Sequence, residues 1–174
     1  MAYAVILTFD RKLAQKIKKI ERIFEEGKIG TTASQVNLDP HITMANFEKA
    51  DEHILIETVS QLKAIRFPVT LIPFGSFLLR KIVLFLNVVP TLDLLNLHNE
   101  YFTLLSKKKM KSDRLYSPDF WMPHCSLSIE IEPEKYFQGI DIITEYHDVL
   151  KGHAHEIKLM KYFPTTEVLV KELK

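Results

Sequence analysis

The segment PHITMANF at residues 40–47 decides the fold, together with its counterpart PHCSLSIEI at residues 123–131. In each segment an apolar run of strand length follows a proline and a histidine. Proline fits just before a strand, because its missing N–H is not needed there. We therefore expect strands over Ile42–Phe47 and Cys125–Ile131, each opened by its histidine motif.

Strand and helix patterns alternate on both sides of residues 40–47. Apolar residues at helical spacing predict one helix that begins after Asp10 and another that is capped by Asp51. The expected elements of the first half are a strand at Tyr3–Phe9, a helix with Leu13, Ile17, Ile20 and Phe24 on one face, the strand Ile42–Phe47, a helix with Ile54, Thr58, Leu62 and Ile65 on one face, and strands at Phe67–Ile72 and Phe74–Leu79, punctuated by Pro73 and Gly75.

The second half of the chain shows the same order of elements. Its expected elements are a strand at Ile82–Val88, a helix after Thr91 with Leu94, Leu95, Phe102 and Leu105, the strand Cys125–Ile131, a helix after Glu132 with Pro133 in its first turn and Ile140, Ile143 and Leu150 along it, and strands at Ile157–Tyr162 and Glu167–Leu173. Each half is thus predicted to be β-α-β-α-β-β. The halves share negligible sequence identity, so the repeat is one of element order.

The composition is that of a folded globular protein, since 47% of the 174 residues are hydrophobic and 26% are charged. No Pro/Gly/Ser-rich linker divides residues 1–174, so we expect a single domain. The formal net charge of +1 means that any basic surface is local. A lone cysteine and the absence of a signal-peptide pattern predict a cytoplasmic protein, and no apolar stretch reaches the roughly 20 residues of a membrane helix.

The two histidine motifs present the same pair of side chains. Successive strand residues point to opposite faces, so His41 and Thr43 share one face, as do His124 and Ser126. Two imidazoles and two hydroxyls in one cleft suit phosphodiester chemistry: a neutral histidine takes a proton from the attacking oxygen, and a protonated one gives a proton to the departing oxygen. The hydroxyls can hold the non-bridging phosphate oxygens. A structural histidine explains a single His-x-Thr, but two copies at matching places favour catalysis.

On these residues the chain resembles the two-histidine (2H) phosphoesterase superfamily, which includes bacterial 2′-5′ RNA ligase-like proteins and 2′,3′-cyclic phosphodiesterases. The resemblance covers essentially the full length. It rests on Pro40-His41-Ile42-Thr43 and Pro123-His124-Cys125-Ser126, supported by the strand stretches Tyr3–Leu7 and Val83–Leu86.

The resemblance implies an α+β fold with two pseudo-symmetric lobes, each β-α-β-α-β-β, and mostly antiparallel sheets around a central cleft. The lobe halves would be roughly residues 1–80 and 81–174. It also implies catalysis by His41 and His124 without a metal or other cofactor, and substrate binding by Thr43 and Ser126. The substrate stays open, because the superfamily acts on tRNA-splicing products, 2′-5′ linkages, cyclic nucleotides and RNA 3′ ends.

A basic and aromatic stretch precedes the second motif. Its cations could hold RNA phosphates and its rings could stack on a base. A solvated helix end and a loop whose aromatic rings pack on the body would explain the same residues. The candidate RNA contacts are Lys108, Lys109, Lys111, Arg114, Tyr116 and Trp121, beside Lys107 and Phe120.

The remaining reactive side chains favour structural interpretations. His153 and His155 have the spacing of two metal ligands on a strand, but no third ligand is evident, so we interpret them as exposed residues at the start of a strand. Surface or boundary positions explain three more histidines, His53, His98 and His147, better than catalysis does. Cys125 neighbours His124, yet strand alternation sends the two side chains to opposite faces and predicts a buried thiol.

The leading hypothesis is a metal-independent phosphodiesterase that hydrolyses a 2′,3′-cyclic phosphate or a 2′-5′ phosphodiester on RNA or a nucleotide. No phosphate loop of the Gly-x-x-x-x-Gly-Lys type is present, which argues against nucleoside triphosphate use, so any ligase activity would be the ATP-independent reversal of cleavage. A module that binds RNA ends without turnover is the other alternative. We expect a monomer that acts on an RNA end or a nucleotide and does not bind membranes.

Overall fold

The structure, a computed structural model, describes residues 1–63, 65–146 and 148–174. In chain order the elements are β1 (Tyr3–Phe9), α1 (Arg11–Glu26), β2 (His41–Phe47), α2 (Glu52–Gln61), β3 (Pro68–Phe77), β4 (Ile82–Val88), α3 (Leu92–Lys107), β5 (His124–Ile131), α4 (Tyr136–Glu145), β6 (Leu150–Lys161) and β7 (Thr166–Glu172). Three single-turn 3₁₀ helices lie at Ser34–Val36, Arg114–Tyr116 and Pro133–Lys135.

The strands of the described chain form one seven-stranded sheet in the order β2-β1-β6-β3-β4-β5, with β7 also paired to β6. Every pairing is antiparallel. The expected α+β fold with mostly antiparallel sheets is therefore confirmed.

The long strand β6 joins the two ends of this sheet. Its first residues, Leu150–His153, pair with β3, whereas Ala154–Lys161 pair with β1. One lobe thus holds β1, β2, β7 and the second part of β6, and the other holds β3, β4, β5 and the first part of β6. The sequence halves 1–80 and 81–174 do not coincide with these lobes. Strand β3 of the first half pairs with β4 of the second, and β6 of the second half pairs with β1 of the first.

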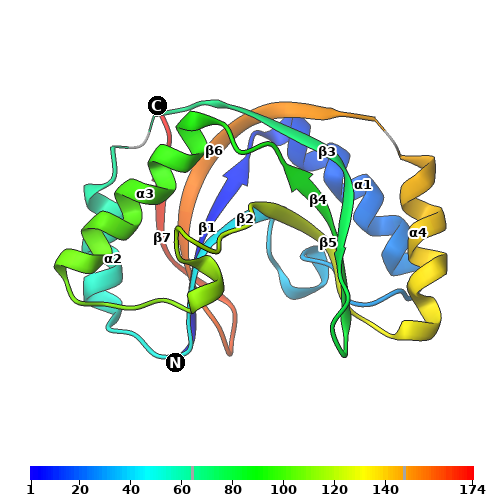
Figure 1. Cartoon of the computed structure of the whole chain (residues 1–174), viewed down its shortest axis with the longest axis horizontal. Helices are drawn as coiled ribbons and strands as arrows, with labels where there is room; N and C mark the ends of the chain where they lie inside the picture. The colour runs from blue at the N-terminus through cyan, green and yellow to red at the C-terminus, as the bar shows by residue number, and fades with distance from the viewer. Residues whose placement is uncertain (64, 147) are drawn as a thin grey trace.

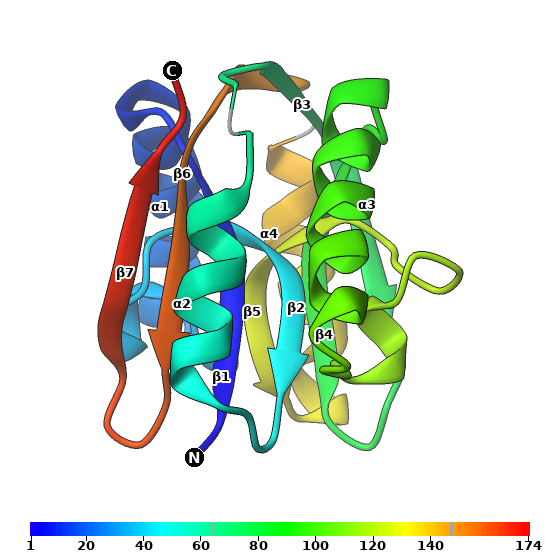
Figure 2. The ribbon, with the colours of Figure 1, turned by 90° about the vertical axis from the view of Figure 1, so that its left-hand side faces the viewer.

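The helices lie in two pairs on either side of the strands. Figure 1 shows α2 and α3 at one end of the molecule and α1 and α4 at the other. Turned by 90°, the molecule presents α2 and α3 to the viewer, with β2 beside α3 (Figure 2). Apolar faces of both pairs are buried in a continuous core, as shown by Leu13 and Phe24 on α1, Leu55 and Val59 on α2, and Leu94 and Tyr101 on α3.

The helix starts follow the capping residues of the sequence. Asp10 accepts a hydrogen bond from the main-chain N–H of Leu13, and Asp51 accepts bonds from the N–H groups of His53 and Ile54. Such caps satisfy N–H groups that have no partner inside the helix. The helix starts expected at Asp10 and Asp51 are confirmed.

The two strands expected at Phe67–Ile72 and Phe74–Leu79 are instead a single strand, β3, so the first half has one strand fewer than expected. An irregularity in the pairing with β4 lies between Ile72 and Gly75. A Cβ atom on Gly75 would lie 2.5 Å from the ring of Phe85, so the glycine allows this ring to approach the strand. The strand therefore continues through the Pro and Gly that suggested a break, and only its pairing is irregular there.

Two helix ends and one strand start also differ from expectation. The helix expected to reach Ile65 ends at Gln61, and Ile65 is 72% exposed. The helix expected to reach Leu150 ends at Glu145, and Leu150 begins β6, well before the expected start at Ile157. Pairing of residues 150–153 with β3 decides this strand, and periodicity within one segment cannot reveal such a distant partner. His147, which we expected at a surface or boundary position, lies outside the described residues.

Candidate active site

The two histidine motifs lie on β2 and β5, which stand at opposite ends of the sheet order yet approach each other in space. β2 and β5 contact each other, and the main chain of His41 on β2 lies near enough to oppose the rise that burial causes in the pKa of the Cys125 thiol on β5. Thr31, in the connection between α1 and β2, forms an isolated bridge with Ile129 of β5. The sheet therefore curves until its two outer strands bring the motifs together.

Burial alternates across both motifs, at the start of each strand, in the way that the sequence predicts. His41 and Thr43 are half-buried while Ile42 is fully buried. On β5, His124 and Ser126 are half-buried while Cys125 is fully buried. Each motif thus turns its imidazole and its hydroxyl to one face and sends the residue between them into the core.

The two imidazoles are held in the same way by the main chain. Nδ1 of His41 lies 2.7 Å from the carbonyl oxygen of Asp39, and Nδ1 of His124 lies 2.6 Å from that of Met122. A carbonyl oxygen only accepts hydrogen bonds, so both Nδ1 atoms carry the hydrogen. The neutral form of each ring therefore has an unprotonated Nε2, which is the atom left for proton transfer.

Burial lowers the pKa of both imidazoles. For His41, burial has the largest effect, the hydrogen bond to the Asp39 carbonyl opposes it, and the nearby His124 lowers the pKa further. For His124, burial also lowers the pKa, against the hydrogen bond to Met122. The effect of His124 on the pKa of His41 indicates that the two rings lie near each other, since like charges interact strongly only at short range in a partly buried site.

Each ring has a different packing environment. The His124 ring packs edge-on against Phe77, with 5.0 Å between ring centroids, and lies 4.9 Å from Phe85. Near His41, the carboxylate of Asp39 forms an ion pair with Lys18 at 2.8 Å and a longer contact with Lys158 at 3.4 Å. Burial would raise the pKa of Asp39, but these lysines hold it below its ordinary value. Asp39 is thus a fixed anion whose own main-chain carbonyl orients His41.

A pocket of about 430 Å³ adjoins the second motif. His124 and Ser126 stand at one side of it, and apolar and aromatic side chains form the rest of its wall. The lining residues are Phe77, Leu79, Val83, Leu115, Tyr116, Phe120, Trp121, Met122, His124, Ser126 and Ile129. A planar or apolar group attached to a phosphate at the histidines would find complementary surface here.

The structure places the lysines of the predicted RNA-contact stretch away from the pocket that its aromatic residues line. Lys108 forms an ion pair with Glu57 of α2. Lys109 and Lys111 are exposed and do not line the pocket beside His124. Arg114 stacks over the ring of Phe120, with 4.2 Å to its centroid. Tyr116 and Trp121 both line the pocket.

Sequence reasoning missed the burial of His98. We expected a surface or boundary position, but His98 is only 1% exposed, and its ring stacks on Trp121 with 3.7 Å between centroids and 2° between planes. Its Nε2 lies 3.2 Å from the main-chain carbonyl of Met44 on β2. A signal was present, because His98 falls at helical spacing between the apolar Leu94 and Tyr101.

The other candidate sites are less suited to chemistry. Cys125 is fully buried, as predicted, and burial raises the pKa of its thiol. His153 is exposed, with Nδ1 3.7 Å from a carboxylate oxygen of Asp10, and His155 is half-buried. Both lie within β6. No group of three or more potential metal ligands occurs among residues 1–63, 65–146 and 148–174.

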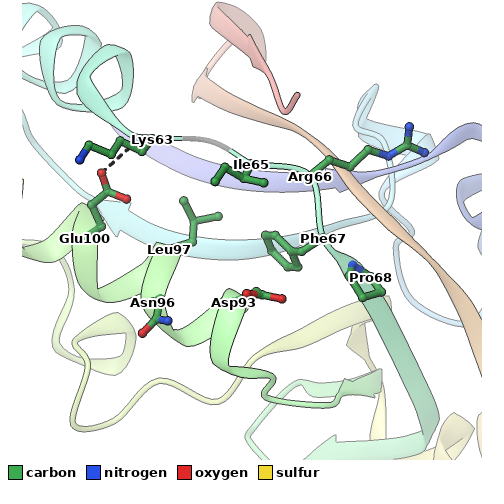
Figure 3. A pocket seen from close by; sticks show the side chains of 9 residues that line it. All are labelled: Lys63, Ile65, Arg66, Phe67, Pro68, Asp93, Asn96, Leu97 and Glu100. Carbon is green, nitrogen blue, oxygen red and sulfur yellow. Dashed lines mark hydrogen bonds between the residues drawn. The ribbon is translucent and has the colours of Figure 1, made fainter.

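Another pocket, of about 310 Å³, lies between α3 and the segment that leads into β3 (Figure 3). Its wall carries Asp93, Asn96 and Glu100, and Glu100 accepts a hydrogen bond from the main-chain N–H of Lys63. It shares no residue with the pocket beside His124. Within the described part of the chain, none of the helices is both long and apolar enough to cross a membrane.

Comparison with solved structures gives relatives over the whole chain at low sequence identity. Escherichia coli LigT in complex with 3′-AMP has 13% identity and a TM-score of 0.68, covering 99% of this chain and 96% of its own. TT0787 of Thermus thermophilus has 11% identity and a TM-score of 0.72, covering 99% and 98%. Usb1 of Kluyveromyces marxianus has 13% identity and a TM-score of 0.53, covering 99% and 96%. At these identities the likeness shows the fold.

No curated protein matches the sequence. The family model described as the 2′-5′ RNA ligase superfamily matches residues 9–163, which include both histidine motifs. The chain therefore belongs to the 2′-5′ RNA ligase superfamily of two-histidine phosphoesterases.

Proposed function

We propose that the protein is a phosphodiesterase that hydrolyses a 2′,3′-cyclic phosphate or a 2′-5′ phosphodiester on RNA or a nucleotide, with His41 and His124 as the acid-base pair. One observation carries the proposal. Both imidazoles donate Nδ1–H to a main-chain carbonyl two residues earlier, so both Nε2 atoms are left for proton transfer. A pair of histidines with only a structural role would not need this matched arrangement.

In the proposed reaction a water oxygen attacks phosphorus and gives its proton to Nε2 of the neutral histidine. The bond from phosphorus to the departing ribose oxygen breaks, and that oxygen receives a proton from Nε2 of the protonated histidine. A cyclic phosphate would open to a phosphate monoester. The hydroxyls of Thr43 and Ser126 would donate to the non-bridging oxygens, where charge grows in the transition state. Exchanging the roles of the histidines exchanges only the direction of attack.

The phosphate that enters the cleft would help to set the protonation states. The pKa values of both free imidazoles are lowered, so the second proton is bound weakly without substrate. A phosphodiester anion between the rings favours a protonated histidine and raises its pKa. Substrate binding thereby prepares the acid while leaving its partner as the base.

The apolar pocket supports a nucleoside-like substituent. Aromatic rings stack on bases, and Tyr116 and Phe120 line the pocket next to His124. Structures of Escherichia coli LigT include complexes with 3′-AMP, ATP and NADP⁺. Since this chain shares that fold, we propose that the base of a terminal nucleotide occupies the pocket while its phosphate lies at the histidines.

The test is a substrate panel of nucleoside 2′,3′-cyclic phosphates and 2′-5′-linked dinucleotides, with products identified by phosphorus NMR. We expect turnover in a strong chelator, because the imidazoles and hydroxyls supply the proton transfers and oxyanion contacts themselves. His153→Ala, which alters an exposed histidine outside the pocket, is the matched control and should keep full activity.

Two outcomes would contradict the proposal. Binding of cyclic phosphates without any product would favour a module that grips RNA ends. Loss of turnover in chelator, restored by one divalent ion, would contradict metal-free catalysis. Incubation of RNA ends bearing a 5′-hydroxyl and a 2′,3′-cyclic phosphate without ATP tests the reverse reaction, which would make the protein an ATP-independent ligase.

A further inference from the structure

The outer edge of β2 is bonded by side chains and loops in place of a neighbouring strand. β2 is the terminal strand of the sheet order, next to β1. The pairing with β1 skips Met44, since Val5 faces Ala45 and Ile6 faces Thr43. This bulge lies directly after the motif residue Thr43, and bulges are common where a strand must aim a side chain at an active site.

Three main-chain carbonyls of this edge receive bonds from distant parts of the chain. The indole Nε1–H of Trp121 donates to the carbonyl of Thr43 at 2.9 Å. Nε2 of His98 lies 3.2 Å from the carbonyl of Met44. The main-chain N–H of Asp113 donates to the carbonyl of Asn46 at 2.8 Å. The segment from Asp113 to Trp121 is therefore hydrogen-bonded at both of its ends to β2, the strand that carries the first motif.

His98 and Trp121 form one rigid unit within this edge. Their rings are parallel to within 2° at 3.7 Å, and Phe102 packs against His98 at 4.7 Å. Burial lowers the pKa of His98 to about 4, so the ring is neutral at ordinary pH, although the main chain of Met44 and of Tyr116 favours the protonated form. A neutral imidazole stacked on an indole in a buried site has little freedom to move.

The Trp121 side chain links the two motifs directly. Its indole bonds to Thr43 of the first motif, and its main chain lies one residue before Met122, whose carbonyl orients His124. A short path thus runs from β2 through Trp121 and Met122 to Nδ1 of His124. Acid and base must stand at a fixed separation across the phosphate, and an error of about 1 Å can cost on the order of 100-fold in rate.

We propose that Trp121 and His98 are positioning residues for the paired histidines: the stack holds Trp121 so that its indole ties the second motif to the first. The proposal deepens the proposed function and rests on it for its kinetic readout. It also changes the predicted role of Trp121, since a ring stacked on His98 and bonded to Thr43 is part of the scaffold rather than a free platform for a base.

The central test is Trp121→Phe, which keeps an aromatic ring against His98 but removes the donor to Thr43. We expect kcat for a nucleoside 2′,3′-cyclic phosphate to fall by about 10-fold or more, with KM within about 2-fold. His98→Gln, which keeps a donor near Met44 but removes the stack, should act in the same direction. Tyr101→Phe is the matched control on α3: it removes a buried hydroxyl with no partner among the described residues, and kcat should not change.

A second readout does not depend on activity. The pKa of His41, measured by NMR titration of its side chain, should move toward the ordinary value of 6.5 in Trp121→Phe. Loss of the bond to Thr43 loosens the edge of β2, which admits water and separates the His41 and His124 rings. Unchanged kcat and an unchanged His41 titration in folded Trp121→Phe would overturn the proposal, as would a loss of activity that only follows the loss of folded protein. If the wild type turns over no phosphodiester, the proposed function fails, and the titration alone decides the positioning role.

Discussion

In each motif histidine, Nδ1 is bonded to the main-chain carbonyl two residues earlier in the chain, which leaves Nε2 as the atom for proton transfer. This arrangement predicts the effect of removing either ring. His41→Ala and His124→Ala should each lower kcat by about 10²- to 10⁴-fold, the usual contribution of one general acid or base. Thr43→Ala and Ser126→Ala should lower it less, because neither hydroxyl transfers a proton.

A substrate with a good leaving group separates the two roles, since its departing oxygen needs no proton. The variant that recovers activity on this substrate has lost the acid, and the other has lost the base. Near-full activity of folded His41→Ala on ordinary substrates would show that the motif assignment is wrong.

The lowered pKa values of both imidazoles predict an acid-shifted pH profile. In the proposed mechanism the productive free enzyme has one protonated and one neutral ring, and burial lowers the pKa of each ring below its ordinary value of 6.5. This form is therefore most abundant below pH 6.5. We expect a bell-shaped profile of kcat/KM with its maximum on the acid side of 6.5, whereas kcat should peak at higher pH because bound phosphate raises the pKa of the acid. A profile with a single limb would contradict the pair.

Glu21 on α1 predicts a different pH effect, on stability. It is fully buried, and its Oε1 has no hydrogen-bond partner among the described residues, while Oε2 accepts from Ser34 at 2.8 Å. Burial raises its pKa from 4.5 to about 7. Because the pKa of Glu21 is higher in the folded than in the unfolded protein, the free energy of unfolding is highest below pH 4.5. It falls as pH rises toward 7 and Glu21 ionises.

Replacing Glu21 should therefore stabilise the protein selectively at high pH. Glu21→Gln cannot ionise, so its free energy of unfolding at pH 8 should exceed that of the wild type by on the order of 3 kcal/mol, with a much smaller difference at pH 5. Urea denaturation at both pH values measures this. The exposed Glu26 of the same helix supplies the control variant Glu26→Gln, which should show no such dependence. Equal gains at both pH values would contradict the burial argument.

At the scale of elements, the connection from α1 to β2 depends on one glycine. Gly30 has a φ of +68°, and a Cβ there would lie 2.3 Å from the carbonyl oxygen of Ile129 on β5. The next residue, Thr31, pairs with the same Ile129. The glycine thus lets the connection lie directly on the strand that carries His124.

Gly30→Ala should destabilise the fold by more than about 1 kcal/mol, since it combines an unfavourable φ with a clash against main chain. Gly27→Ala, three residues earlier, has an ordinary φ, and its nearest neighbour at 3.0 Å is the flexible end of Ile29. Gly27→Ala should therefore lower the free energy of unfolding far less than Gly30→Ala does. Thermal unfolding of the two variants side by side gives the comparison, and equal costs would count against the close approach.

The elements also show what the sequence can and cannot specify. Local chemistry was sufficient for the caps at Asp10 and Asp51 and for the alternation along β2 and β5, because caps and side-chain direction depend on near neighbours. The start of β6 at Leu150 was not predictable, because pairing with β3, far away in the chain, decides it. The stack of His98 on Trp121 was hidden for the same reason: the two residues meet only after α3 packs beside β2.

At the scale of the whole molecule, the shared strand β6 predicts cooperative unfolding. β6 pairs with β1, β3 and β7, so neither lobe retains a complete sheet once this strand is released. Urea unfolding should be a single transition, with loss of secondary structure measured by circular dichroism coinciding with loss of amide protection in β4 and in β1. Protection that disappeared from one lobe at clearly lower urea would show that the lobes are independent.

The stacked pair described above also has an optical consequence. Trp121 is the chain's single tryptophan, so all indole emission originates at the junction of the two motifs and at the wall of the pocket beside His124. A protonated imidazole quenches an excited indole in contact with it, and the pKa of His98 is lowered to about 4. Trp121 fluorescence should decrease as pH falls through that value. At neutral pH, a nucleotide that fills the pocket should alter both the intensity and the wavelength of the Trp121 emission. The protein thus carries its own probe of occupancy, with no added label.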